Sequence, residues 1–176
     1  MHVGRLGSPL LERPQAARML RIEHPVLLPD EMATLRALPG FPAATLDATC
    51  PVHSRPESLE AVLDTLCRRA EAATRKGARL VIISDRKVGP DRAPIPALLA
   101  LGAVRQHLVR TGLRAKVGLV VEAGDAIEQH DIAALIGYGA EAVHPWVATE
   151  SVATLFAEAH GAARSEEHTS ELQSRQ

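Results

Sequence analysis

Hydrophobic residues between positions 44 and 163 follow two alternating patterns. Unbroken apolar runs, such as residues 80–83, are separated by segments in which apolar residues recur every three or four positions. An unbroken run is typical of a strand in a parallel sheet that is covered on both faces. The longer spacing is typical of an amphipathic helix. The pattern therefore predicts strands and helices that alternate along the chain.

The expected elements form four successive strand–helix units. We expect strands at residues 45–50, 80–83, 117–121 and 140–143, and helices at 57–76, 95–110, 125–136 and 147–160. This alternation predicts an α/β fold with a parallel sheet, either open or part of a (β/α) barrel. Four strands cannot close a barrel of eight, so we expect a partial (β/α) barrel whose edges something else should cover.

Helix boundaries in this scheme rest on capping patterns. Ser54 and Glu57 fit a capping box with Pro56 in the first turn, and Gly77 can end that helix. Asp125 and Glu128 fit a second capping box.

The two ends of the chain differ from the middle. Residues 1–43 are rich in proline and glycine, which predicts an extended linker with a short helix near residues 30–38. Residues 44–163 form the expected domain. Residues 164–176 are almost wholly polar and resemble translated adapter sequence, so we expect a tail that is artefactual or, alternatively, naturally disordered.

Composition removes several classes of function. Twenty basic and 21 acidic residues give a formal charge of −1, so we expect no nucleic-acid partner and no anionic membrane surface. The longest uncharged apolar run, residues 93–104, contains two prolines and is shorter than the roughly 20 residues of a spanning helix. Cys50 and Cys67 show no CxxC spacing, so a reduced cytoplasmic protein is expected.

Candidate functional residues lie where the predicted strands end, because function in parallel α/β folds gathers at the carboxyl ends of strands. Asp85 and Arg86 follow the second strand, and the guanidinium could bind a carboxylate or phosphate. The alternative is a local ion pair that orders the loop up to Arg92. Glu122 follows the third strand and could act as a general base or could accept backbone N–H groups of the next loop.

A metal site is not expected from the histidines. His144 follows the fourth strand, but no HxxxH or HxH spacing exists. His130 and Asp131 are adjacent, so on a helix they point about 100° apart. Cys67 lies on an apolar helical stripe, which predicts packing. We therefore expect no catalytic, cofactor-binding or metal-binding residues, and retain as strand-end candidates only Asp85, Arg86, Glu122, His130 and His144.

Several peptides, taken in order, carry a resemblance to a known family. They are residues 44–51, 59–70, 84–86, 91–96 and 136–140, the last followed by Pro145. Together they resemble the central domain of the large subunit of glutamate synthase. Two departures stand out: that family usually has paired histidines where this chain has Gln129-His130-Asp131, and Asn or Tyr where it has His144.

The resemblance implies a large enzyme. In that family an N-terminal amidotransferase domain hydrolyses glutamine, and ammonia passes to a flavin-bearing synthase domain that adds it reductively to 2-oxoglutarate. The central domain lies between them, binds no flavin and does no chemistry. It is implied to hold the catalytic domains in register and to help shield the ammonia route. FMN and an iron–sulphur cluster are implied for the full-length large subunit, with a small subunit as a further partner.

The resemblance also predicts a fragment that is inactive by itself. No cysteine follows Met1 closely, as the family's glutaminase requires, and none lies beyond Cys67 for an iron–sulphur site. Residues 1–43 would then be a linker after a missing glutaminase domain. Two alternatives remain: a stand-alone α/β small-anion-binding domain or enzyme that uses Asp85, Arg86, Glu122 and His144, and a free-standing interaction module. The sequence does not indicate an electron donor.

Overall fold

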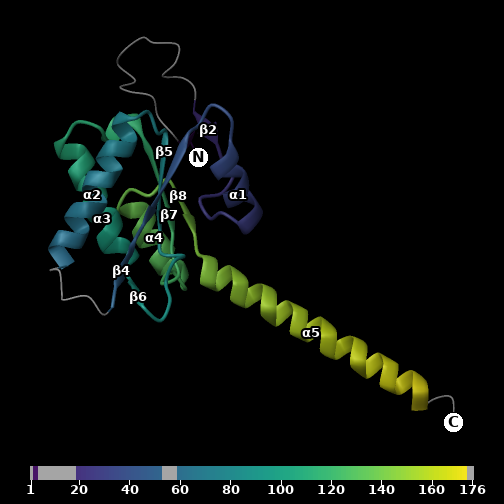
Figure 1. Ribbon diagram of the computed structural model, residues 1–176. Helices are drawn as coiled ribbons and strands as arrows, with labels where there is room; N and C mark the ends of the chain where they lie inside the picture. The colour runs from purple at the N-terminus through teal and green to yellow at the C-terminus, as the bar shows by residue number, and fades with distance from the viewer. Residues whose placement is uncertain (1, 4–18, 53–58, 174–176) are drawn as a thin grey trace.

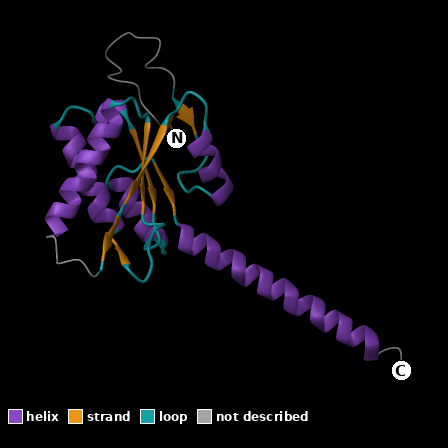
Figure 2. Cartoon of the chain, in the orientation of Figure 1, coloured by secondary structure: helices purple, strands orange, loops and turns teal. Residues whose placement is uncertain are grey.

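The centre of the molecule is a sheet of four parallel strands. The computed structural model describes residues 2–3, 19–52 and 59–173, with side chains as far as residue 159. The predicted capping box at Ser54 and Glu57 lies outside the described residues. The sheet has the order β3-β5-β7-β8, and it lies between the helices at the centre of the molecule (Figure 2). Its strands are β3 (Ala43–Asp47), β5 (Leu80–Ser84), β7 (Gly118–Glu122) and β8 (Ala142–His144). The predicted α/β fold with an open, partial-barrel sheet is confirmed.

The first predicted strand is divided in two. β3 ends at Asp47, whose carboxylate accepts the backbone N–H of Thr49 at 3.1 Å and its hydroxyl at 2.6 Å. Such a side-chain bond to the backbone two residues on favours a turn. The chain then enters β4 (Thr49–Pro51), which pairs antiparallel with β6 (Arg92–Pro94) outside the main sheet.

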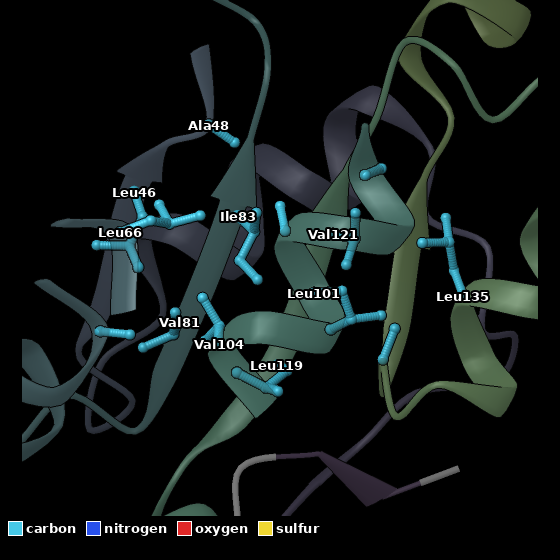
Figure 3. Close-up of a cluster of buried hydrophobic side chains, with 14 of the residues drawn as sticks. Leu46, Ala48, Leu66, Val81, Ile83, Leu101, Val104, Leu119, Val121 and Leu135 are labelled. Atoms are coloured by element: carbon cyan, nitrogen blue, oxygen red, sulfur yellow. The ribbon is translucent and has the colours of Figure 1, made fainter. Parts of the chain in front are cut away.

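Three helices cover one face of the sheet (Figure 1). They are α2 (Leu59–Arg75), α3 (Ala97–Arg110) and α4 (Gln129–Gly137), and a short 3₁₀ helix (Arg114–Lys116) follows α3. Alternate strand residues such as Val81, Ile83 and Val121 point into this core, together with Leu101 of α3 and Leu135 of α4 (Figure 3). The chain has few aromatic residues, and this core is built from branched aliphatic side chains and alanine.

The helix boundaries follow from local chemistry. Gly77 has a φ of 96°, as predicted for the residue that ends α2. The predicted capping box at Asp125 is wrong. Glu128 is the N-cap of α4, and the carboxylate of Asp131 accepts its N–H at 2.9 Å. The Asp125 carboxylate instead accepts the N–H of Ala97, the first residue of α3, at 3.0 Å.

The N-terminal segment covers the opposite face of the sheet. The predicted short helix is present as α1 (Pro29–Ala37), and its Met32 and Leu35 are buried. They pack with Ile82, Val120 and the other strand residues that point away from α2 and α3. Two short strands, β1 (His2–Val3) and β2 (Leu20–Arg21), pair beside α1.

The same segment also covers one edge of the sheet. Val26 forms a parallel bridge with Val143 of β8. Leu27 N–H donates to the Val143 carbonyl at 2.8 Å, and Val143 N–H donates to the Pro25 carbonyl at 2.8 Å. The expectation that something else must cover the sheet is thus met in part by residues 19–43 themselves.

The last helix, α5 (Trp146–Gln173), begins next to its predicted start and projects away from the sheet (Figure 1). The predicted end at residue 160 is wrong, because the helix continues into the polar segment. Residues 151–159 are exposed. The origin of residues 164–176 stays a prediction. No helix in the described part of the chain is long and apolar enough to cross a membrane.

Replacement of Met32 by Ala tests whether the N-terminal segment is part of the fold. Met32 is almost fully buried against the sheet. We expect Met32→Ala to lower the free energy of unfolding by about 2–4 kcal/mol, measured by urea denaturation, because a cavity would form in this core. Leu28→Ala is the matched control: Leu28 is 56 % exposed in the same segment, so a change within about 0.5 kcal/mol is expected. Equal effects for the two variants would contradict the packing described here.

Candidate functional site

The carboxyl ends of the four strands bring one row of polar side chains together. The register pairs Asp47 with Ser84, Ser84 with Glu122, and Glu122 with His144 on successive strands. Sequence reasoning identified Glu122 and His144 from strand ends. It missed Asp47 as a member of this row, because its pairing depends on the register of a strand whose end was misplaced.

Glu122 is the most enclosed charge of the row, with 1 % of its surface exposed. Its Oε2 accepts Nη2 of Arg36 at 2.6 Å and the hydroxyl of Ser84 at 2.5 Å. Its Oε1 faces Nε of Arg86 at 3.4 Å. The expected backbone N–H partners are replaced by side chains, two of them cationic. The negative charge of Glu122 is thus compensated by groups of the same chain.

Asp85 is also buried, but it uses neutral donors. Its Oδ1 accepts the indole N–H of Trp146 at 2.6 Å, and its Oδ2 accepts the backbone N–H of Gly124 at 2.7 Å. Burial raises the pKa of Asp85 above its ordinary value of 3.8, although these hydrogen bonds act in the opposite direction. Trp146 lies so close to Gly124 that a Cβ there would be 3.0 Å from the indole ring. Glycine at position 124 therefore makes room for the contact.

The predicted local ion pair between Asp85 and Arg86 is wrong. Arg86 donates from Nη1 to Glu150 of α5 at 2.6 Å, and its guanidinium lies 4.7 Å from the ring centroid of Trp146. With Glu122 as its third partner, Arg86 is engaged on several sides by groups of the same chain. An external carboxylate or phosphate would have to displace one of them.

His144 ties the sheet to the N-terminal segment. Only 1 % of its surface is exposed, and Nδ1 lies 2.7 Å from the carbonyl oxygen of Leu27. A carbonyl can only accept, so Nδ1 carries the proton and donates it. This bond adjoins the backbone pairing of Leu27 with Val143 and gives His144 a structural partner.

His130 does not join the row. It is exposed in the first turn of α4, and its neighbour Asp131 caps that helix. Among the described residues, no group of three or more His, Cys, Asp or Glu side chains could hold a metal ion.

Asp47 ends the row with a second ion pair. Its Oδ2 accepts Nη2 of Arg92 at 2.8 Å, and Nζ of Lys87 lies 3.7 Å away. The pKa of Asp47 is lowered, because the hydrogen bonds from Thr49 and the charges of Arg92 and Lys87 outweigh the effect of burial. Sequence reasoning identified Arg86 but missed Arg36 and Arg92 as partners of the row, since these two lie far along the chain from their carboxylates.

The two cofactors implied by the resemblance find few available groups among these residues. A flavin phosphate at the carboxyl edge would have to compete with Asp47 and Glu122 for Arg36, Arg86 and Arg92, which are already paired with those carboxylates. Cys50 and Cys67 lie on different elements, β4 and α2, and burial raises the pKa of the Cys67 thiol. Neither thiol is placed to supply one face of an iron–sulphur cluster.

This geometry defines an α/β domain whose strand-end groups form hydrogen bonds and ion pairs with other segments of the same chain. The model of the family described as "Glutamate synthase central domain" matches residues 1–175, so the chain belongs to this family. The recognised family is thus confirmed.

Curated relatives agree with this assignment. The chain is 42 % identical over 151 residues to the glutamate synthase [NADPH] large chain of Azospirillum brasilense, which covers 86 % of the chain and 10 % of that protein. It is 38 % identical over 148 residues to the corresponding large chain of Bacillus subtilis, covering 83 % and 9 %. It is 36 % identical over 154 residues to the chloroplastic ferredoxin-dependent glutamate synthase of Spinacia oleracea, covering 86 % and 10 %. The chain thus spans about a tenth of the length of these relatives.

The shifted pKa of Asp85 predicts a pH dependence with a definite sign. Because the pKa of Asp85 is raised in the folded chain, its contribution to stability is fully present below 3.8 and falls as the pH rises through the folded pKa. We therefore expect the free energy of unfolding of Asp85→Asn, relative to the parent, to increase as the pH rises from below 3.8 through the folded pKa, measured by urea denaturation.

Asp47→Asn provides a control of opposite sign. The pKa of Asp47 is lowered, so the parent gains stability from it as the pH rises through the folded pKa toward 3.8. The stability of Asp47→Asn relative to the parent should therefore decrease over that window. The same trend in both variants would contradict the assigned environments.

Proposed function

We propose that the chain is the central, non-catalytic part of a glutamate synthase large subunit. The observation that carries this is the family match over residues 1–175 combined with strand-end groups that are paired within the chain. In the proposed enzyme, the glutamine amide nitrogen is transferred reductively to 2-oxoglutarate to make glutamate. This chain would lie between a glutaminase domain and a flavin-bearing synthase domain and hold them in register.

The proposal assigns the chemistry to other parts of the enzyme. FMN and the iron–sulphur cluster would belong to the rest of the large subunit, and a small subunit would be a further partner. The relatives are named for different electron donors, NADPH for the bacterial large chains and ferredoxin for the spinach protein, so no donor is assigned.

The proposed boundaries and compartment follow from the sequence. Residues 1–43 would follow the glutaminase domain and supply the cover of the sheet that α1 provides. Residues 44–163 would form the rest of the central domain, and residues 164–176, helical as far as Gln173, would be an artefactual tail. Two free cysteines, Cys50 and Cys67, fit a reducing compartment, and the cytoplasm is the one we propose.

The stand-alone anion-binding alternative is not favoured by the geometry. Arg86 already has two carboxylate partners, and His144 is buried against a backbone carbonyl. A small anion would find no unpaired cation at this edge among the described residues of the row.

The first test is enzymatic. The 176-residue chain should neither hydrolyse glutamine nor form glutamate from glutamine and 2-oxoglutarate with a reductant, because the catalytic groups lie elsewhere. Product analysis of the purified chain measures both reactions. Catalysis that follows the protein through purification would overturn the proposal.

The second test uses a full-length glutamate synthase that contains this chain. Met32→Ala loosens the packing of α1 on the sheet without touching a catalytic group. We expect it to lower glutamate formation more than glutamine hydrolysis, so that free ammonia appears in the medium. Leu28→Ala, at an exposed position, should leave the ratio of glutamate to ammonia unchanged. A proportional loss of both reactions in Met32→Ala would contradict a role in holding the domains in register.

A further inference from the structure

The helix α5 meets the rest of the described chain at its first turn. Residues 146–149 are half-buried, whereas residues 150–159 are exposed. Trp146 donates its indole N–H to Asp85, and Glu150 accepts Nη1 of Arg86 at 2.6 Å. The Arg86 guanidinium also lies over the Trp146 ring. Arg86 is therefore in contact with two separate residues of α5.

Arg86 is shared with a buried carboxylate. Its Nε lies 3.4 Å from Oε1 of Glu122, and the other oxygen of Glu122 holds Arg36 at 2.6 Å. Arg36 belongs to the last turn of α1. One buried carboxylate thus lies between a guanidinium supplied by α1 and the guanidinium that contacts α5.

The two carboxylates compete for Arg86 on unequal terms. Glu122 is buried and needs a cationic partner, because an uncompensated charge away from water is costly. Glu150 is half-exposed, so solvent screens its pair with Arg86 and can replace it. While Arg36 compensates Glu122, Arg86 can reach out to Glu150. Without Arg36, Arg86 is the remaining cation that an ion pair places at Glu122 among the described residues.

We propose that Arg36, Glu122 and Arg86 form a conformational switch through which α1 controls the anchorage of α5. When Arg36 leaves Glu122, Arg86 turns inward to replace it and gives up Glu150 and the Trp146 ring. The first turn of α5 then detaches more often. The switch concerns contacts inside this chain and does not depend on the proposed function. A negatively charged partner that takes up Arg36 would operate it.

The test replaces Arg36 and measures how firmly the first turn of α5 is held. Trp146 is the single tryptophan of the chain, so acrylamide quenching of its fluorescence reports on the first turn of α5. Hydrogen exchange at the amide of Thr149, which donates to the Pro145 carbonyl at 3.0 Å, gives a second reading. We expect Arg36→Ala to raise exchange there by about two- to tenfold, the lower part of the range of coupling between residues of one network, and to raise the quenching constant. Thr34→Ala is the matched control, since Thr34 is exposed on α1 and bonds only within that helix.

The decisive comparison repeats Arg36→Ala together with Glu122→Gln. The amide has nearly the same shape but no charge, so it does not draw Arg86 inward. We therefore expect Arg36→Ala to have no further effect on α5 when Glu122→Gln is present. An equal effect in both backgrounds would overturn the proposal, and so would an Arg36→Ala variant whose α5 readings match the parent.

Hydrogen exchange of the β7 amides distinguishes global unfolding from release of α5, because β7 lies in the core of the sheet. If Arg36→Ala raises exchange in β7 as well, the test uses Arg36→Gln instead. The glutamine keeps a hydrogen-bond donor near Glu122 and lacks the charge. The same selective increase at the Thr149 amide is expected. Arg36→Lys should return the α5 readings toward those of the parent, and a failure of this charge-restoring variant to do so would count against the switch.

Discussion

The structure depends on the need to cover both faces of a parallel sheet. The central strands β5 and β7 consist of residues that are buried on either side, and alternate side chains enter two separate cores. Helices α2, α3 and α4 supply one cover. The other comes from the N-terminal segment, which would read as a linker if its sequence were taken alone. Apolar burial stabilises by about 25 cal/mol per Å², so a sheet with one bare face would lose a large part of its stability.

Burial of the sheet also determines what its polar ends can do. Strand ends that bind ligands in many α/β proteins lie here beneath α1 and the first turn of α5. Glu122 and Asp85 are enclosed, and each is satisfied by groups from distant segments. His144 is satisfied by the backbone of the segment that covers β8. Strand-end groups that bind ligands in many α/β proteins here hold segments of this chain together, which agrees with the positioning role proposed above.

The sequence predicted those features that leave a periodic or local trace. The strand–helix order, the two central strands and α1 could be located because burial on one or both faces produces a recognisable spacing. Glu122 and His144 were located because they end apolar runs. Their partners could not be predicted, since Arg36 and Glu122 are 86 residues apart and no local pattern joins them. The N-cap of α4 was misplaced for a different reason: acidic residues at 125, 128 and 131 repeat the capping spacing twice.

The bridge between Val26 and Val143 has a consequence for any shortened form of this protein. A chain that began at residue 44 would keep the whole predicted domain, yet the outer backbone groups of β8 would lose their partners. An unpaired, apolar strand edge is a template on which another molecule can add a strand. Val143 and its neighbours in β8 are fully buried in the intact chain, and truncation would expose this strand to association with other molecules. The N-terminal boundary of the folded domain therefore lies before Pro25, and fragments that begin after this residue would be prone to aggregate.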